Sequence, residues 1–150
     1  MHSDLTIRRF EKKDSDEVIR LWDRCGLIVP WNHPGRDIER KLAQQPEGFL
    51  VAEKKGRIVA SVMAGYDGHR GWVNYLAVEP DERRTGYGRV MMEAAEEVLK
   101  KAGAPKVNLQ VRETNAEVIA FYESIGYKND HVVSFGKRLE PDPGWTETSK

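Results

Sequence analysis

Residues 72–89 constrain the fold of this chain more than any other stretch of its sequence. The stretch begins as an apolar run typical of a strand and turns at Pro80. It continues through the loop Arg83-x-x-Gly86-x-Gly88, and a long amphipathic pattern that predicts a helix follows at once. Such a junction directs free backbone N–H groups and the positive end of the helix dipole at one point. This arrangement suits an anion.

Two common phosphate-binding motifs are excluded at this loop. A Walker loop requires Gly-Lys followed by Ser or Thr, whereas Gly88 is followed by Arg89. A dinucleotide fingerprint requires a third glycine, and Met91 occupies that position. The remaining interpretation is a glycine loop that receives a phosphate on its main-chain amides, with Arg83, Arg84 and Arg89 adding positive charge.

The composition indicates one soluble domain over residues 1–150. Lys+Arg and Asp+Glu cancel at 24 each, so bulk charge gives no reason to expect nucleic acid or an acidic membrane as a partner. No apolar run approaches the length of a membrane span, and the first residues do not resemble a signal peptide. Cys25 is the single cysteine and cannot form an intramolecular disulfide, which suits the cytoplasm. His33 has no second ligand at metal-site spacing, so we expect no metal.

Periodicity predicts the other elements of the chain. Strands are expected at residues 5–10, 48–53, 57–66, 72–78 and 106–112, with one or two more in residues 127–139. In that last segment Val132, Val133 and Phe135 should point inward. Four helices are expected at residues 14–25, about 37–45, from the glycine loop to 102, and 115–125. Asp14 and Glu17 should form a capping box at the first helix, and residues 140–150 should be a peripheral tail.

A second motif supports the glycine loop. Residues 115–127 run from Asn115 through Tyr122-Glu-Ser-Ile-Gly-Tyr127, and residues 76–80 read Leu-x-Val-x-Pro before the loop. Together these patterns resemble the GNAT family of N-acetyltransferases, whose second motif is N-x-x-A-x-x-L-Y-E-x-x-G-F. Here Val118, Phe121 and Tyr127 replace its Ala, Leu and Phe. The resemblance covers residues 5–139. It implies an α/β (α+β) GNAT fold with about four helices and a mixed, mostly antiparallel sheet of six to seven strands, splayed at its centre.

The resemblance also implies roles for individual residues. Backbone amides of the splayed middle strand, at Leu76 and Val78, would bind the acetyl carbonyl and the pantetheine arm of acetyl-CoA, and Ala77 between them belongs to the same cofactor-binding segment. Asn115 would hold the pantetheine side, and Tyr122 would protonate the CoA thiolate as general acid. The pyrophosphate would lie on the loop residues Arg83, Arg84, Thr85, Gly86, Tyr87, Gly88 and Arg89.

The amine acceptor and the general base are not fixed by the sequence. Acceptor contacts are expected from the irregular apolar loop between the first two helices, at Trp31, Asn32 and His33. They are also expected from the strand at residues 72–78 and the turn before it, at Tyr66, Asp67 and Tyr75. Residues 109–115 resemble the L-E-V-R-x-x-N of ribosomal-protein alanine acetyltransferases, but Gln110 replaces the Glu proposed as the base. The alternatives are a water chain, an acceptor that arrives neutral, or another side chain, namely Glu79, Glu113, Asp67 or Tyr75.

Two functions follow from these expectations. The first is direct acetyl transfer from acetyl-CoA to a primary amine of a small molecule or a peptide N-terminus. The second is acyl-CoA binding without turnover, as a sensor or regulatory protein. The missing base favours the second function, whereas the presence of Tyr122 favours the first. The loop at residues 25–34 and the turn at residues 65–71 resemble the YpeA-like bacterial acetyltransferases. The acceptor amine stays unidentified, and the sequence leaves a homodimer open.

Overall fold

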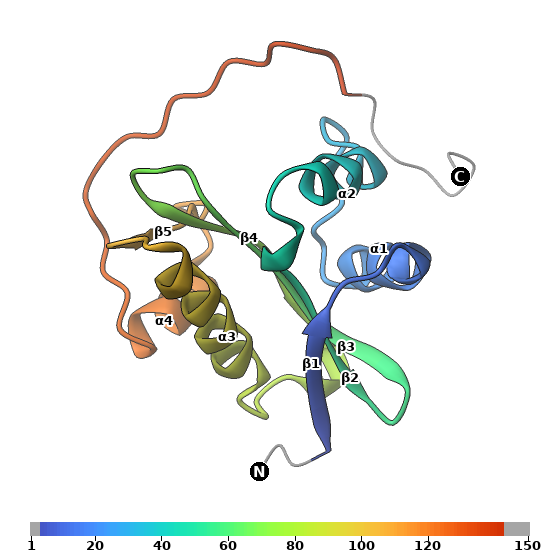
Figure 1. Ribbon diagram of the computed structural model, residues 1–150. Helices are drawn as coiled ribbons and strands as arrows, with labels where there is room; N and C mark the ends of the chain where they lie inside the picture. The colour runs from blue at the N-terminus through green and yellow to red at the C-terminus, as the bar shows by residue number, and fades with distance from the viewer. Residues whose placement is uncertain (1–3, 143–150) are drawn as a thin grey trace. The chain divides into compact units, whose positions relative to one another are not determined.

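A computed structural model describes residues 4–142, and these fall into two compact units. The first contains residues 4–108 together with Asp142, and the second contains residues 109–141. The first unit is built on one five-stranded sheet, with α3 on one face and α1 and α2 on the other (Figure 1). Strand order along the sheet follows the chain, β1-β2-β3-β4-β5.

Tight turns join β2 to β3 and β3 to β4, whereas α1 and α2 lie between β1 and β2, and α3 lies between β4 and β5. β1 is Leu5–Arg9, β2 Phe49–Lys54, β3 Arg57–Tyr66, β4 Gly71–Val78 and β5 Val107–Asn108. The first three pairings are antiparallel, and β4 pairs with β5 in parallel. The hairpin between β2 and β3 turns at Lys55 and Gly56, whose φ angles of 53 and 77 are those of a two-residue turn that matches the strand twist.

Four helices complete the described structure, as the periodicity predicted. They are α1 Ser15–Arg24, α2 Pro34–Ala43, α3 Tyr87–Ala102 and α4 Ala116–Ser124. Single 3-10 turns precede α1, β2 and α3, at Lys12–Asp14, Pro46–Gly48 and Pro80–Glu82. α4 lies in the second unit and is N-capped by Asn115, whose Oδ1 accepts a hydrogen bond from the Val118 N–H at 3.3 Å.

An aromatic stack fills the core between α1 and the sheet. Trp22 is completely buried and packs face to face on Tyr75, with ring centroids 3.9 Å apart. On its other side it approaches Phe49, which stacks in turn on Phe10 at 4.1 Å. Aromatic pairs of this kind contribute stability beyond their buried area. The stack therefore fixes α1 over the centre of the sheet.

β4 contains a bulge opposite Val62. Ser61 pairs with Ala77 and Met63 pairs with Asn74, so one residue of β3 faces two residues of β4. One of these two, Tyr75, has a φ of 53, in the left-handed region that a bulky residue rarely adopts. The bulge lies within the stretch from which the sequence analysis started.

Ser61 satisfies two polar groups beneath the bulge. Its Oγ accepts a hydrogen bond from Trp22 Nε1 at 2.8 Å and donates one to the carbonyl of Tyr75 at 2.9 Å. Ser61 itself is completely buried, and the other buried residues of its strand are apolar. Because a buried polar group without a partner is costly, one hydroxyl stabilises both the tryptophan and the irregular carbonyl.

The prediction of six to seven strands is wrong for the described residues, which form five. The strand expected at residues 106–112 is reduced to Val107–Asn108, and residues 128–139 contain none. There Asn129 Oδ1 accepts the His131 N–H at 2.7 Å and His131 has a φ of 55, so the backbone turns instead of extending. Val132, Val133 and Phe135, expected to point inward, are 78%, 79% and 94% exposed. An alternating apolar pattern forms a strand only where a neighbouring strand is available to pair with it.

Two helix starts also differ from expectation. The capping box lies at Glu11 and Asp14, around the 3-10 turn, and Glu17 instead accepts the Ile58 N–H of β3 at 2.8 Å. α2 begins at Pro34 rather than near Asp37 because the His33 ring accepts the Arg36 N–H and proline suits the first helical position.

We predict that Ser61→Ala lowers the free energy of unfolding by about 2–3 kcal/mol. The substitution leaves Trp22 Nε1 and the Tyr75 carbonyl without their buried partner. Urea unfolding with an unchanged m-value would measure the loss. Ser15→Ala is the control, since Ser15 Oγ makes only a local hydrogen bond to the Lys12 carbonyl. Equal effects of the two substitutions would contradict the assigned role of Ser61.

Candidate functional site

The second half of β4 directs backbone amides away from β3. At its start, the Gly71 N–H donates to the Lys106 carbonyl, on the β5 side, at 2.8 Å. Just beyond its end, the Glu79 N–H donates to the Val59 carbonyl, on the β3 side, at 2.8 Å. Residues an even number apart in a regular strand share an edge, so the bulge has reversed this alternation. The N–H groups of Leu76 and Val78 consequently face the edge opposite β3.

β5 covers only the beginning of that edge. The parallel pairing consists of Gly71 with Val107 and Trp72 with Asn108, and it stops there. The Val78 carbonyl confirms the direction, because it accepts from Cys25 Sγ and from Arg83 Nε, both at 3.3 Å, and neither group belongs to β3. Within the described part of the chain, no strand pairs with β4 on this edge beyond Trp72. The side chain of Ala77 lies in the core.

The first turn of α3 lacks the features that usually neutralise a helix start. Gly86 is the N-cap residue with a φ of 86, and it offers no side-chain cap. The first turn holds no acidic residue, and the first hydrogen bond of the helix runs from the Val90 N–H to the Gly86 carbonyl. The amides of that turn therefore point out of the helix end, together with the positive end of its dipole.

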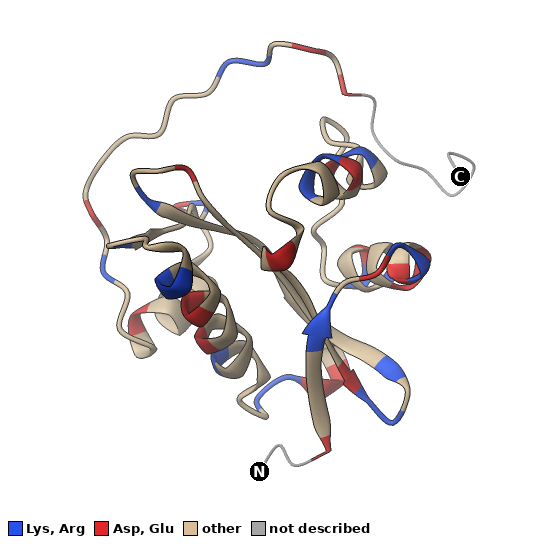
Figure 2. Cartoon of the chain, in the orientation of Figure 1, with Lys and Arg blue, Asp and Glu red and all other residues tan. Residues whose placement is uncertain are grey.

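The loop before α3 contains two arginines, Arg83 and Arg84, and the basic positions of the chain are coloured blue in Figure 2. Both residues are exposed, and Arg84 has a φ of 65. Thr85 Oγ1 donates to the Glu82 carbonyl at 2.5 Å, which holds the loop in a turn. The Tyr87 ring is buried beneath Lys54 Nζ, 5.7 Å from its centroid, so its side chain packs the loop against the sheet.

Glu79 fastens the end of β4 to α1. Its carboxylate is nearly buried and accepts three hydrogen bonds from Arg24, at 2.6 to 3.1 Å. Loss of Arg24 would leave this nearly buried carboxylate without its charged partner. Glu79 therefore has a structural role, since its ion pair with Arg24 fixes the point where β4 ends and the loop begins.

Two other base candidates from the sequence are engaged as well. The Tyr75 hydroxyl donates to Asp37 Oδ2 at 2.7 Å, and burial together with this carboxylate raises the Tyr75 pKa above its ordinary value. The Asp67 carboxylate accepts the N–H groups of Arg70 and His69, which lower its pKa, and it also accepts Trp72 Nε1 at 3.1 Å. Tyr75 is thus a hydrogen-bond donor, and Asp67 stabilises the turn.

The remaining acceptor candidates lie at the ends of α2 and β3. Trp31 is 50% exposed, and the Asn32 N–H donates to the Val29 carbonyl at 3.3 Å in the loop before α2. Both main-chain groups of Tyr66 bond Gln45, just after α2, at 2.8 and 2.6 Å. α2 therefore connects the regions that the sequence proposed for the acceptor.

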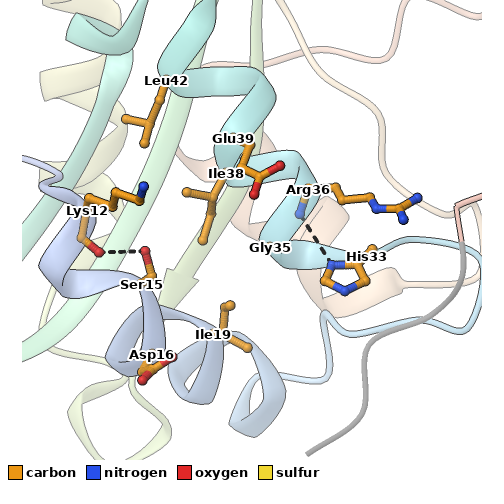
Figure 3. A pocket seen from close by; sticks show the side chains of 10 residues that line it. All are labelled: Lys12, Ser15, Asp16, Ile19, His33, Gly35, Arg36, Ile38, Glu39 and Leu42. Carbon is orange, nitrogen blue, oxygen red and sulfur yellow. Dashed lines mark hydrogen bonds between the residues drawn. The ribbon is translucent and has the colours of Figure 1, made fainter. Parts of the chain in front are cut away.

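A groove of about 390 Å³ runs between α1 and α2 (Figure 3). Ile19, Ile38 and Leu42 line it with apolar groups, and charged side chains surround them. His33 is the one residue of the loop at residues 29–33 among those lining it. No residue of β4 or of the glycine loop contributes, so this groove is separate from the start of α3.

The second unit contains Tyr122, Asn115 and Gln110. Tyr122 packs edge-on against Phe121 and Tyr127, and burial raises its pKa to about 12. Its hydroxyl consequently stays protonated at neutral pH. The Gln110 side-chain amide donates to Ser134 Oγ and cannot accept a proton as a carboxylate would. Glu113 is exposed.

Sequence reasoning missed three residues of the network around Tyr75. Asp37, Arg40 and Asp142 form a chain of ion pairs and hydrogen bonds that ends on the Tyr75 hydroxyl. Asp142 is buried, although it lies in the stretch expected to be a peripheral tail, and residues 143–150 of that stretch lie outside the described residues. A sequence pattern gave no signal for this chain, because Asp142 stands 102 residues from Arg40.

Two absences concern residues 4–142 alone. No helix in this range is long and apolar enough to cross a membrane. No cluster of three or more His, Cys, Asp or Glu side chains in the same range could hold a metal ion.

Comparison with known proteins gives one family. Residues 15–127 match the model of the acetyltransferase (GNAT) family. An acetyltransferase of Yersinia enterocolitica is 49% identical over 92% of this chain and 98% of its own length. The structure of Ard1 from Thermoplasma volcanium has a TM-score of 0.71 at 28% identity, covering 82% of each chain. The ribosomal-protein-S18-alanine N-acetyltransferase of Escherichia coli has a TM-score of 0.64 at 27% identity, over 81% of this chain and 76% of its own.

Proposed function

The chain belongs to the GNAT acetyltransferase family and is an N-acetyltransferase, and on that premise we propose its reaction. The protein, acting as one domain in the cytoplasm, moves the acetyl group of acetyl-CoA directly to a primary amine of a small molecule or a peptide or protein N-terminus. The family uses acetyl-CoA as co-substrate. The observation that carries the proposal is the reversed edge of β4, with the Leu76 and Val78 amides turned away from β3.

These amides suit a thioester carbonyl and an amide-containing arm. When an amine attacks the thioester, negative charge develops on the carbonyl oxygen, and a fixed N–H donor stabilises it most in the transition state. One of the two amides takes this role, and the other bonds the pantetheine chain. Their positions are fixed by the bulge before any ligand arrives, so little reorganisation opposes the reaction.

The glycine loop receives the pyrophosphate of CoA. The N-terminal amides of α3 donate to its oxygens, and the helix dipole together with Arg83 and Arg84 favours its charge. Gly86 and Gly88 lack a Cβ and allow the phosphate to approach the main chain. Residues 83–89 therefore bind the pyrophosphate mainly through main-chain N–H groups, as the family pattern implies.

Tyr122 acts as general acid to the departing thiolate, and Asn115 holds the pantetheine side. A hydroxyl whose pKa is about 12 remains protonated through the whole working range, so it is available as a donor. An ordinary thiol has a pKa of about 8.5, which is lower than the pKa of this hydroxyl. The hydroxyl therefore assists the departing sulfur by donating a hydrogen bond to it as the C–S bond breaks.

The engagement of Glu79, Asp67 and Tyr75 favours an acceptor that loses its proton readily. The α-amine of a peptide, with a pKa of about 7.7–8.0, is substantially neutral near pH 7.5, whereas a lysine side chain at ~10.4 is almost fully charged. Such an acceptor needs only water as its base. An N-terminal α-amine also agrees with the name of the Escherichia coli neighbour, although Gln110 stands where that enzyme class is expected to have Glu.

We predict that Thr85→Glu weakens acetyl-CoA binding about tenfold relative to Thr85→Gln at low salt. The two variants lose the same hydrogen bond to Glu82 and differ only in a negative charge beside the proposed pyrophosphate site. Calorimetric titration with acetyl-CoA measures both dissociation constants. The difference between the two dissociation constants should become smaller at high salt, because mobile ions screen exposed charges. Equal affinities at low salt would place the pyrophosphate elsewhere.

We predict that Tyr122→Phe lowers kcat by roughly one to three orders of magnitude, because the general acid is lost, while acetyl-CoA affinity barely changes. Steady-state kinetics and a binding titration separate the two quantities. The wild-type kcat should also show no alkaline decline near pH 10, because the Tyr122 pKa is raised to about 12. An unchanged kcat in the variant would remove Tyr122 from the mechanism.

The proposed reaction is tested by release of free CoA thiol in the presence of peptide α-amines, small primary amines and lysine derivatives. We expect turnover, fastest with amines of low pKa. A thermal shift with acetyl-CoA accompanies the assay, since ligand at ~100 times its Kd adds about 2.7 kcal/mol of stability. Binding without turnover of any amine would indicate a sensor. No thermal shift would contradict the acetyl-CoA site itself.

A further inference from the structure

Asp142 is a buried carboxylate that meets three groups from a distant part of the chain. It is 4% exposed, and its oxygens accept the His33 N–H at 3.1 Å and two Arg40 nitrogens at 3.2 and 3.4 Å. Arg36 Nη1 lies 3.5 Å away. A carboxylate removed from water needs such charged and main-chain donors. The mechanism described above does not use this cluster.

His33 is where the acceptor loop, residues 29–33, becomes α2. Its ring accepts the Arg36 N–H at 3.3 Å and its carbonyl accepts the N–H groups of Arg36 and Asp37. Asp142 Oδ2 accepts a hydrogen bond from the main-chain N–H of the same residue. The carboxylate therefore holds the end of the loop that carries Trp31 and Asn32.

A relay connects the same carboxylate to the bulge of β4. Arg40 Nη1 bonds Asp142 Oδ2 at 3.2 Å and Asp37 Oδ1 at 3.0 Å, so one nitrogen joins two carboxylates. Asp37 Oδ2 accepts the Tyr75 hydroxyl at 2.7 Å. Tyr75 is the bulged residue with a φ of 53. Asp142 thus touches the loop directly and the bulge through two side chains.

We propose that Asp142 is a positioning residue for the acceptor amine, holding residues 29–33 and, through Arg40 and Asp37, the Tyr75 side of the site. This inference rests on the proposed acetyl transfer and adds a residue that governs acceptor binding. The Arg40 and His33 donors hold the Asp142 pKa at about 2, so the carboxylate is charged at every pH at which the enzyme would work.

The test compares Asp142→Asn with Glu140→Gln, which removes an exposed carboxylate two positions away. With the best amine of the panel, Asp142→Asn should raise the acceptor KM about tenfold, while kcat and the acetyl-CoA Kd stay within about twofold. Glu140→Gln should match the wild type in all three. An unchanged acceptor KM, or equal losses in kcat and acetyl-CoA affinity, would overturn the proposal.

A second measurement does not depend on turnover. Amide hydrogen exchange at His33 should accelerate in Asp142→Asn, because the charged acceptor of that N–H is gone. If the asparagine variant fails to fold, Asp142→Glu keeps the charge but displaces it, and a raised KM with faster His33 exchange is expected there. Unchanged exchange refutes the positioning role, whereas absence of wild-type turnover refutes only the proposed reaction.

Discussion

The left-handed backbone of Tyr75 decides which way the second half of β4 faces. A bulky residue in this region costs on the order of 1 kcal/mol, so surrounding contacts must compensate. Three elements do so: α1 stacks Trp22 on the ring, β3 supplies Ser61 to the carbonyl, and α2 supplies Asp37 to the hydroxyl. Because each contact comes from a different element, the irregular residue is held by the tertiary structure as a whole.

α1 acts on β4 at two separate points. Trp22 stabilises the bulge, while Arg24, two residues further on, and the C-cap residue Cys25 contact Glu79 and the Val78 carbonyl. The helix thereby fixes both ends of the short segment whose amides we assign to the thioester and the pantetheine arm. The start of α3 contributes in a different way, since Gly86 gives its first turn no side-chain cap and the turn holds no acidic residue. We propose that the rigid strand and this helix start together bind a long, polar cofactor.

Local sequence patterns predicted most of the helices and strands, but they did not predict contacts between residues that lie far apart in the sequence. The bounds of β3 and the span of α3 follow from periodicity and from Gly103, whose φ of 97 ends the helix. The start of α2 was missed because His33 caps it with a ring nitrogen, an uncommon cap. The relay through Asp142 was missed because Arg40 and Asp142 lie 102 residues apart, and no sequence pattern links them. The strands expected after Tyr127 failed because no neighbouring strand pairs with them among the described residues.

The reversal of β4 has a consequence for how such a chain tolerates change during evolution. The groups on its open edge are main-chain amides, so exchanging the side chains of Leu76 or Val78 for others of similar size leaves those donors in place. Loss of one residue in the bulge would instead restore regular alternation and turn the donors toward β3. Substitutions can accumulate in this segment, whereas its length is fixed by the direction of its hydrogen bonds.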